Sequence, residues 1–295
     1  MTELRAFLQR LCEMATENYY NPYRTFSWSE TLPDDTLWMT ADLLSVCGTS
    51  AASQIEPSTL QRLSKWESIN FYSLNVHGIR ELLIEVVKRV QMPGFEDFSE
   101  FFHHFIGEEN EHMWFFAEFC NRYGGKIYPS VGLKTATSGD MSIEHFLVFA
   151  RILLFEEIVD FYNQRMAGDN TLHEMIRQVN RIHHQDESRH IAFGRRVVSL
   201  LYHKIGDEMR AAKKRELEAY LKSYITFSLR SLYSPSVYSD AGIPNPHQFR
   251  NEILNSASRR KYEWDAVKKI VSFFVNSGIF QDPVLPGFST PSQEI

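Results

Sequence analysis

Two Glu-x-x-His motifs are the residues of this sequence whose types and spacing suggest shared chemistry. They are Glu109 with His112 and Glu187 with His190. Residues three apart lie on one face of an α-helix, so each motif presents a carboxylate and an imidazole side by side. A single motif arises often by chance, but both of these stand within apolar stripes, where an unpaired carboxylate would be very costly. Buried carboxylates persist when they are paired or bind metal, so the two motifs predict a shared metal site.

Apolar residues surround both motifs at helical spacing. The first stripe contains Phe102, Phe105, Ile106, Met113, Phe116 and Cys120, and the second contains Ile176, Val179, His183, Ile191, Gly194 and Val198. A helix that faces a core buries such a stripe. We therefore expect both motifs to point into one helical core.

Helical periodicity also dominates the rest of the chain, without a convincing run of alternating strands. It predicts helices over residues 2–20, 58–91, 97–123, 142–166, 171–204, 207–232, part of 246–258 and 262–276. Ser58 is a candidate N-cap for the first long helix, and Met92-Pro93-Gly94 is its stop. The four helices between 58 and 204 make two hairpins with a longer connection, which predicts an all-α, ferritin-like four-helix bundle. Residues 1–295 are expected to form a single domain, with the metal-binding core at about 58–205 and additional helices at 2–20 and 207–276.

Such a site takes one further glutamate from each of the other two helices. On the first hairpin we expect Glu81, because it lies 13 residues before the turn at Gly94 while Glu109 lies 15 residues after it. On the second hairpin the candidates are Glu156 and Glu157. Glu156 is favoured because apolar residues stand at helical spacings around it and its side chain leans toward the level of the second motif.

Three histidines near these positions have different expected roles. His183 lies one turn before Glu187 on the same face, so it is either a third imidazole ligand or a core histidine beside the metals. His184 points elsewhere and is expected to be solvated. His77, one turn before Glu81, is expected to pack beside the site or to support a ligand.

Two acidic residues are candidates to support the ligands. Asp186 and Glu108 each precede a motif glutamate. Metal-bound histidine usually donates its other N–H to a carboxylate, which makes Asp186 a candidate partner of His112 and Glu108 of His190. The alternative is surface charge paired with Arg189 or Arg122.

The donor types indicate the metal. Four carboxylates and three imidazoles form a hard, oxygen-rich set that suits iron or manganese rather than copper(I) or thiolate-bound zinc. Two ions are expected, since a single ion would leave carboxylates without neutralising charge.

Composition excludes several other functions. The net charge is −6 and no long Lys/Arg cluster occurs, which argues against nucleic-acid binding. No stretch reaches the roughly 20 apolar residues of a membrane span, and the amphipathic N-terminus is no signal peptide, so we expect a cytoplasmic protein. Cys12, Cys47 and Cys120 have neither disulfide nor zinc spacing and are expected to be reduced thiols. Phosphate-loop, dinucleotide-binding and hydrolase motifs do not occur.

Three segments resemble a known family, the ferritin-like diiron N-oxygenases typified by para-aminobenzoate N-oxygenase. They are Glu-Glu-Asn-Glu-His at 108–112, Phe-Glu-Glu at 155–157 and His-His-Gln-Asp-Glu-Ser-Arg-His at 183–190. The resemblance covers roughly residues 58–205. The extra histidine that distinguishes this family from diiron hydroxylases maps to His183. The resemblance implies seven ligands to two irons: Glu81, Glu109, His112, Glu156, His183, Glu187 and His190.

The resemblance also implies an activity. The centre would use O2 to oxidise the nitrogen of a small amine to a hydroxylamine, nitroso or nitro product in secondary metabolism. Because no flavin or nicotinamide motif occurs, electrons would come from a reductase or a ferredoxin-type carrier, and a homodimer is expected of this class. The alternatives are another diiron oxidase, such as a C–H hydroxylase, desaturase or radical generator, and a metal-storage bundle.

Overall fold

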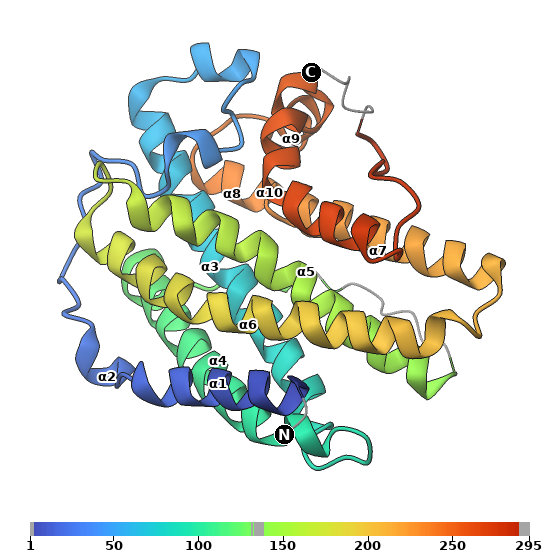
Figure 1. Cartoon of the computed structure of the whole chain (residues 1–295). Helices are drawn as coiled ribbons and strands as arrows, with labels where there is room; N and C mark the ends of the chain where they lie inside the picture. The colour runs from blue at the N-terminus through green and yellow to red at the C-terminus, as the bar shows by residue number, and fades with distance from the viewer. Residues whose placement is uncertain (1–2, 131, 133–138, 289–295) are drawn as a thin grey trace.

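Four long helices form the centre of the molecule (Figure 1). In this computed structural model, which describes residues 3–130, 132 and 139–288, they are α3 (Pro57–Val87), α4 (Ser99–Phe119), α5 (Met141–Gly168) and α6 (Glu174–Gly206). The helices pair extensively as α3 with α4 and α5 with α6, so two helical hairpins pack face to face. Helices account for all regular structure in the described residues. The predicted all-α, ferritin-like four-helix bundle is confirmed.

Local sequence explains where these helices begin and end. Asp140 caps α5 by accepting a hydrogen bond from the Ser142 amide at 2.8 Å, which satisfies one of the free N–H groups of the first turn. α3 begins at Pro57, whose fixed φ suits the first helical position, so Ser58 lies inside the helix and the prediction of an N-cap there is wrong. α3 ends at Val87, a few residues earlier than predicted, and a turn follows in which Gln91 has φ 56°.

Side-chain contacts fix the directions of the helices. Between α3 and α5, Phe71 stacks on Tyr162 with ring centroids 5.1 Å apart, while Gly78 lies against Phe155 further along. Residue numbers thus rise on α3 as they fall on α5, and these two helices are antiparallel. Since each hairpin is also antiparallel, α3 and α6 run in the same direction and occupy opposite corners of the bundle.

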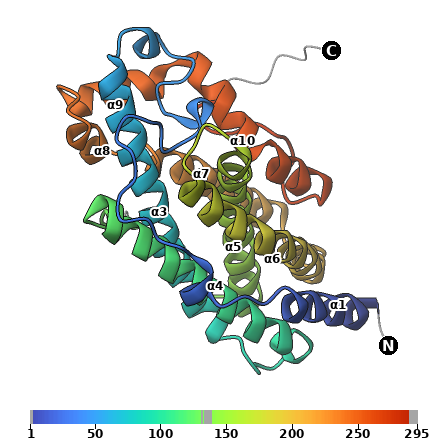
Figure 2. The ribbon, with the colours of Figure 1, turned by 90° about the vertical axis from the view of Figure 1, so that its left-hand side faces the viewer.

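The remaining helices cover the outside of the bundle (Figure 2). α1 (Glu3–Glu17) packs on α4 and α6, while α7 (Ala211–Ser231) and α10 (Ala257–Asn276) pack on α5. α8 (Pro235–Asp240) lies on α3 and contacts α9 (Pro246–Asn255), and α2 (Pro22–Thr25) follows α1. The last long helix begins at Ala257, five residues before the predicted start at 262, because Ser256 caps it by accepting from the Arg259 amide.

The bundle core is rich in aromatic rings. The fully buried ones include Phe71, Phe101, Phe102, Phe115, Phe116, Phe119, Phe146 and Phe149. α4 continues into a π-helical segment, Cys120–Gly124, and the following Gly125 adopts φ 65°. Cys12, Cys47 and Cys120 are free thiols, of which Cys12 and Cys120 are buried.

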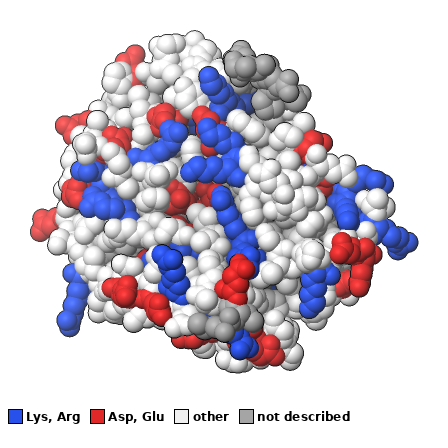
Figure 3. Space-filling model, in the orientation of Figure 1, with Lys and Arg blue, Asp and Glu red and all other residues white. Residues whose placement is uncertain are grey.

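The described part of the chain has no helix long and apolar enough to cross a membrane. On the face seen in Figure 3, basic and acidic side chains are interspersed.

Candidate metal centre

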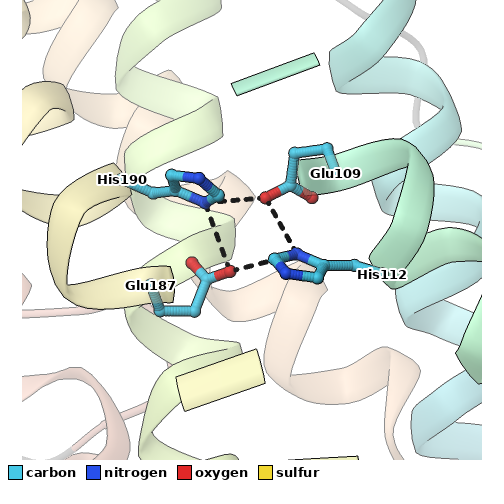
Figure 4. Close-up of side chains that lie close together, drawn as sticks. All are labelled: Glu109, His112, Glu187 and His190. Carbon is cyan, nitrogen blue, oxygen red and sulfur yellow. Dashed lines mark ion pairs between the residues drawn. The ribbon is translucent and has the colours of Figure 1, made fainter. Parts of the chain in front are cut away.

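The two Glu-x-x-His motifs meet in the middle of the bundle (Figure 4). The four side chains are buried, with α4 and α6 facing each other in antiparallel register. His190 Nδ1 lies 2.7 Å from Glu109 Oε1 and 3.4 Å from Glu187 Oε1. His112 Nδ1 lies 3.3 Å and 3.7 Å from the same two oxygens. Each imidazole therefore directs Nδ1 at the carboxylates of both helices.

Two further side chains join this cluster. His183 Nε2 lies 3.2 Å from Glu187 Oε1, and its ring centroid is 4.4 Å from that of His112. Glu156 is 1% exposed and stands beside the motif glutamates. Its neighbour Glu157 instead accepts a hydrogen bond from Arg195 Nε at 2.7 Å. Of the two alternatives on α5, the structure thus brings Glu156 to the cluster.

Glu81 lies away from the cluster, and the expectation that it is a ligand must be corrected. Its side chain is 67% exposed and forms an ion pair with Arg80 at 3.1 Å. The α3 residues that face the bundle at this level are buried: Tyr72, Asn75, Ile79, Leu82 and Val86. Counting residues from the hairpin turn gives a height along a helix but no direction around it. Glu81 lies on the outward-facing side of α3.

The two remaining histidines lie at the edges of the site. His184 is half-buried, with Nδ1 2.5 Å from Asp160 Oδ1, so it is held by a carboxylate rather than by solvent alone. His77 Nε2 donates to the carbonyl oxygen of Tyr128 at 2.7 Å. Neither side chain belongs to the cluster.

Hydrogen bonds hold the outer nitrogens of all three inward-facing imidazoles. Both expected partners are in place: Asp186 Oδ2 lies 3.0 Å from His112 Nε2, and Glu108 Oε2 lies 2.8 Å from His190 Nε2. A carboxylate can only accept, so Nε2 carries a proton in both rings, and Nδ1 is the nitrogen left to face the carboxylates. For His183 the amide of Asn163 lies 2.5 Å from Nδ1, which leaves Nε2 to face the cluster.

Arg189 links the two supporting carboxylates. Its Nη2 donates to Glu108 at 2.6 Å and to Asp186 at 2.5 Å, and the residue is 3% exposed. Asp186 therefore bonds both the histidine and the arginine that the sequence offered as alternatives, while Arg122 pairs with Glu118. The sequence does not predict that Arg189 also reaches Glu108 or that Asn163 contacts His183. Arg189 lies three residues after Asp186 and Asn163 seven after Glu156, spacings that place each on a shared helix face.

The donor atoms of the cluster fit metal ions. Within the described residues, these buried atoms have no hydrogen-bond partner: both carboxylate oxygens of Glu109, Glu156 and Glu187, Nδ1 of His112 and His190, and Nε2 of His183. Orphaned buried polar atoms are costly and normally rare. Oxygen and imidazole donors suit iron and manganese. These six side chains are therefore the residues that would hold the ions.

Charge within the cluster supports the same assignment. Burial opposes protonation of His112, but attraction to Glu109 and Asp186 outweighs it and raises the pKa of His112 to about 10. Burial, followed by repulsion from Glu187 and Glu109, raises the pKa of Glu156 well above its ordinary value. Burial lowers the pKa of His183 to about 4. The metal-free cluster thus retains protons on His112 and Glu156, and bound cations would take their place.

A cavity of about 620 Å³ lies between α3, α5 and α7. Ile152 and Val159 line it, one turn before and one turn after Glu156, and Asn75 lines it from α3. Arg151 also borders the cavity, and its guanidinium donates to the Tyr220 hydroxyl at 3.1 Å. The cavity therefore lies beside the turn of α5 that carries Glu156, although Glu156 itself does not line it.

The bundle and its Glu/His cluster define a diiron oxygenase, the class in which paired Glu-x-x-His motifs hold metals between helical hairpins. The chain matches the family described as P-aminobenzoate N-oxygenase AurF over residues 2–278. It belongs to that family.

No curated protein matches the chain. Among solved structures, a mutant of an R2-like ligand-binding oxidase with an anaerobically reconstituted Mn/Fe cofactor is similar at 14% identity and a TM-score of 0.44. The similarity covers 87% of this chain and 92% of that one.

Proposed function

We propose that this diiron oxygenase is an N-oxygenase that converts the amine nitrogen of a small molecule to a hydroxylamine, and further to nitroso or nitro products, in secondary metabolism. The observation that carries the proposal is His183, a third imidazole directed at a cluster that the paired motifs already form. The matched family takes its description from an N-oxygenase, which supports the same activity.

The first oxidation has a simple balance. A primary amine, O2, two electrons and two protons give a hydroxylamine and water, with one oxygen atom bonded to nitrogen and the other reduced. Two iron ions, with manganese as the alternative, would be held by Glu109, His112, Glu156, His183, Glu187 and His190 and would supply the activation of O2. The electrons would come from a reductase or a ferredoxin-type partner.

The protein itself would position the amine and keep water away. The cavity beside Glu156 has room for a small molecule, and such sites are usually concave and largely apolar. The aromatic rings of the core separate the cluster from solvent on the α4 side, since Phe115 and Phe116 are fully buried next to His183. Arg151 at the cavity wall would attract an anionic group of the substrate.

The direct test uses iron-loaded, chemically reduced protein with ¹⁸O2 and a panel of primary aromatic and aliphatic amines, each with a hydrocarbon of the same shape. We expect ¹⁸O in a hydroxylamine or nitro product detected by mass spectrometry. Label in an alcohol from the hydrocarbon would favour a C–H hydroxylase instead. Iron uptake without O2-dependent product from any compound would favour a storage role.

A matched pair of variants tests the part played by the third imidazole. His183→Gln should abolish amine oxidation, whereas His184→Gln, at the adjacent half-buried position, should retain it. Equal activity of the two variants would show that His183 has no special role and would contradict the N-oxygenase proposal.

A further inference from the structure

The four helices of the bundle contribute unequally to the cluster. α4, α5 and α6 supply one carboxylate each, Glu109, Glu156 and Glu187, whereas Glu81 of α3 points outward. The buried stripe of α3 that faces the bundle reads Ser68, Tyr72, Asn75, Ile79, Leu82 and Val86. It has no acidic residue. Glu67, the buried acid of this helix, accepts from the Ser45 amide at 3.0 Å, two turns before Asn75.

Contacts around Tyr72 give the height of Asn75 in the bundle. The Tyr72 hydroxyl accepts a hydrogen bond from Asn180 Nδ2 of α6 at 2.7 Å, and its ring stacks on Phe116 of α4. One turn further along α3 comes Asn75. Since α6 runs in the same direction and α4 in the opposite one, the corresponding turns carry His183 and His112.

Contacts between α3 and α5 place Asn75 at a similar height in the bundle. Phe71 and Tyr162 face each other, as do Gly78 and Phe155. Asn75 lies midway between Phe71 and Gly78, and Glu156, next to Phe155, lies within about two residues of the matching position on α5. Asn75 is therefore the polar residue of the α3 stripe that shares its level with the cluster.

The amide of Asn75 has a fixed orientation. Its Nδ2 donates to the carbonyl oxygen of Phe71 at 2.8 Å, which directs Oδ1 the other way. The residue is fully buried, and among the described residues Oδ1 has no hydrogen-bond partner. An unpaired buried carbonyl is costly and rare in folded proteins. A carbonyl oxygen is also an accepted ligand of manganese and similar ions.

We infer that Asn75 Oδ1 is the contribution of α3 to the metal centre, a neutral amide oxygen where each other helix supplies a carboxylate. This inference rests on the dimetal centre of the proposed function but not on the nature of the substrate. Three carboxylates do not neutralise two divalent ions. An ion next to Asn75 would therefore be held more weakly than its neighbour, and Asn75 also lines the cavity from which small molecules would reach it.

A Mn²⁺ titration of the metal-free protein tests this without O2 or amine. Calorimetry and electron paramagnetic resonance should resolve two binding steps that differ at least about tenfold in affinity. Asn75→Asp keeps the shape and adds a charge, so it should tighten the weaker step by about tenfold. Asn75→Leu should lose the weaker step and retain the stronger one.

Asn180→Leu is the matched control, because it also removes a buried amide from this core. It should leave both steps in place. Equal affinities in the unmodified protein, an unchanged weaker step in Asn75→Asp, or the same loss in Asn180→Leu would overturn the assignment. Failure to oxidise amines while the Asn75 effects hold would refute only the N-oxygenase activity, whereas failure to bind metal would refute both.

Discussion

The three imidazoles of the cluster differ in what supports them. His112 and His190 each donate to a carboxylate, whereas His183 lies beside the neutral amide of Asn163. A carboxylate partner makes imidazole a stronger donor and fixes its tautomer. Side chains outside the cluster should therefore affect how tightly metal is bound. Replacing one of them should change the metal affinity by a measurable amount.

Replacing Asp186 tests this support. Asp186→Asn keeps the size but removes the charge beside His112 Nε2, so the affinity for Fe²⁺ or Mn²⁺ should fall about 10–100-fold in a metal titration. Asp160→Asn is the control, since Asp160 supports His184 outside the cluster. A comparable loss in both variants would mean that the effect is not specific to the ligand.

Removing a buried carboxylate should have opposite effects with and without metal. Glu156→Leu relieves an orphaned buried acid, so the metal-free variant should melt at a higher temperature than the metal-free native chain. The rise in melting temperature on adding Mn²⁺ should largely disappear. Thermal unfolding with a chelator and with Mn²⁺ measures both. A variant that is less stable under both conditions would show that Glu156 serves packing alone.

At the scale of elements, α3 and α5 approach closely where Gly78 meets Phe155. A Cβ at Gly78 would overlap the Phe155 ring, whereas one at Gly107 of α4 would meet open space. Gly78→Ala should therefore lower the free energy of unfolding by about 1–3 kcal/mol. Gly107→Ala should raise it by about 0.5–1 kcal/mol. Urea unfolding measures the free energy of unfolding of both variants. If the Phe155 ring causes the overlap, adding Phe155→Leu to Gly78→Ala should restore stability.

The first half of α3 carries a pH-dependent contact. Burial raises the pKa of Glu67 from 4.5 to about 7, although its bond to the Ser45 amide partly offsets this. The unfolded chain therefore releases this proton at lower pH than the folded chain. The free energy of unfolding should fall as pH rises from 4.5 to 7, by up to about 3 kcal/mol.

Urea unfolding of the metal-free protein between pH 5 and 8 measures this dependence. Glu67→Gln retains an acceptor for Ser45 and should flatten the curve, whereas Glu13→Gln on the surface should not. An unchanged slope in Glu67→Gln would assign the pH dependence to other groups.

At the scale of the whole molecule, sequence periodicity predicts the bundle because long helices with apolar stripes can bury them in few ways. The two motifs and His183 follow from spacing within one helix, α4 or α6. Glu81 shows the limit, since the direction of a side chain around α3 depends on how the helices are rotated against one another. The bond from Arg189 to Glu108 and the contact of Asn163 with His183 are not predicted either, because each joins two different helices.

The meeting of the two motifs also has a mechanical consequence. Glu109 and His112 belong to one hairpin and Glu187 and His190 to the other, so bound ions clamp the two halves of the chain together. The two hairpins would then be linked by metal coordination as well as by the peptide between Gly124 and Met141. A chain cut there, at an inserted protease sequence, should hold its fragments together to a higher urea concentration with metal than with a chelator. Size-exclusion chromatography of the cut protein would show whether the clamp exists.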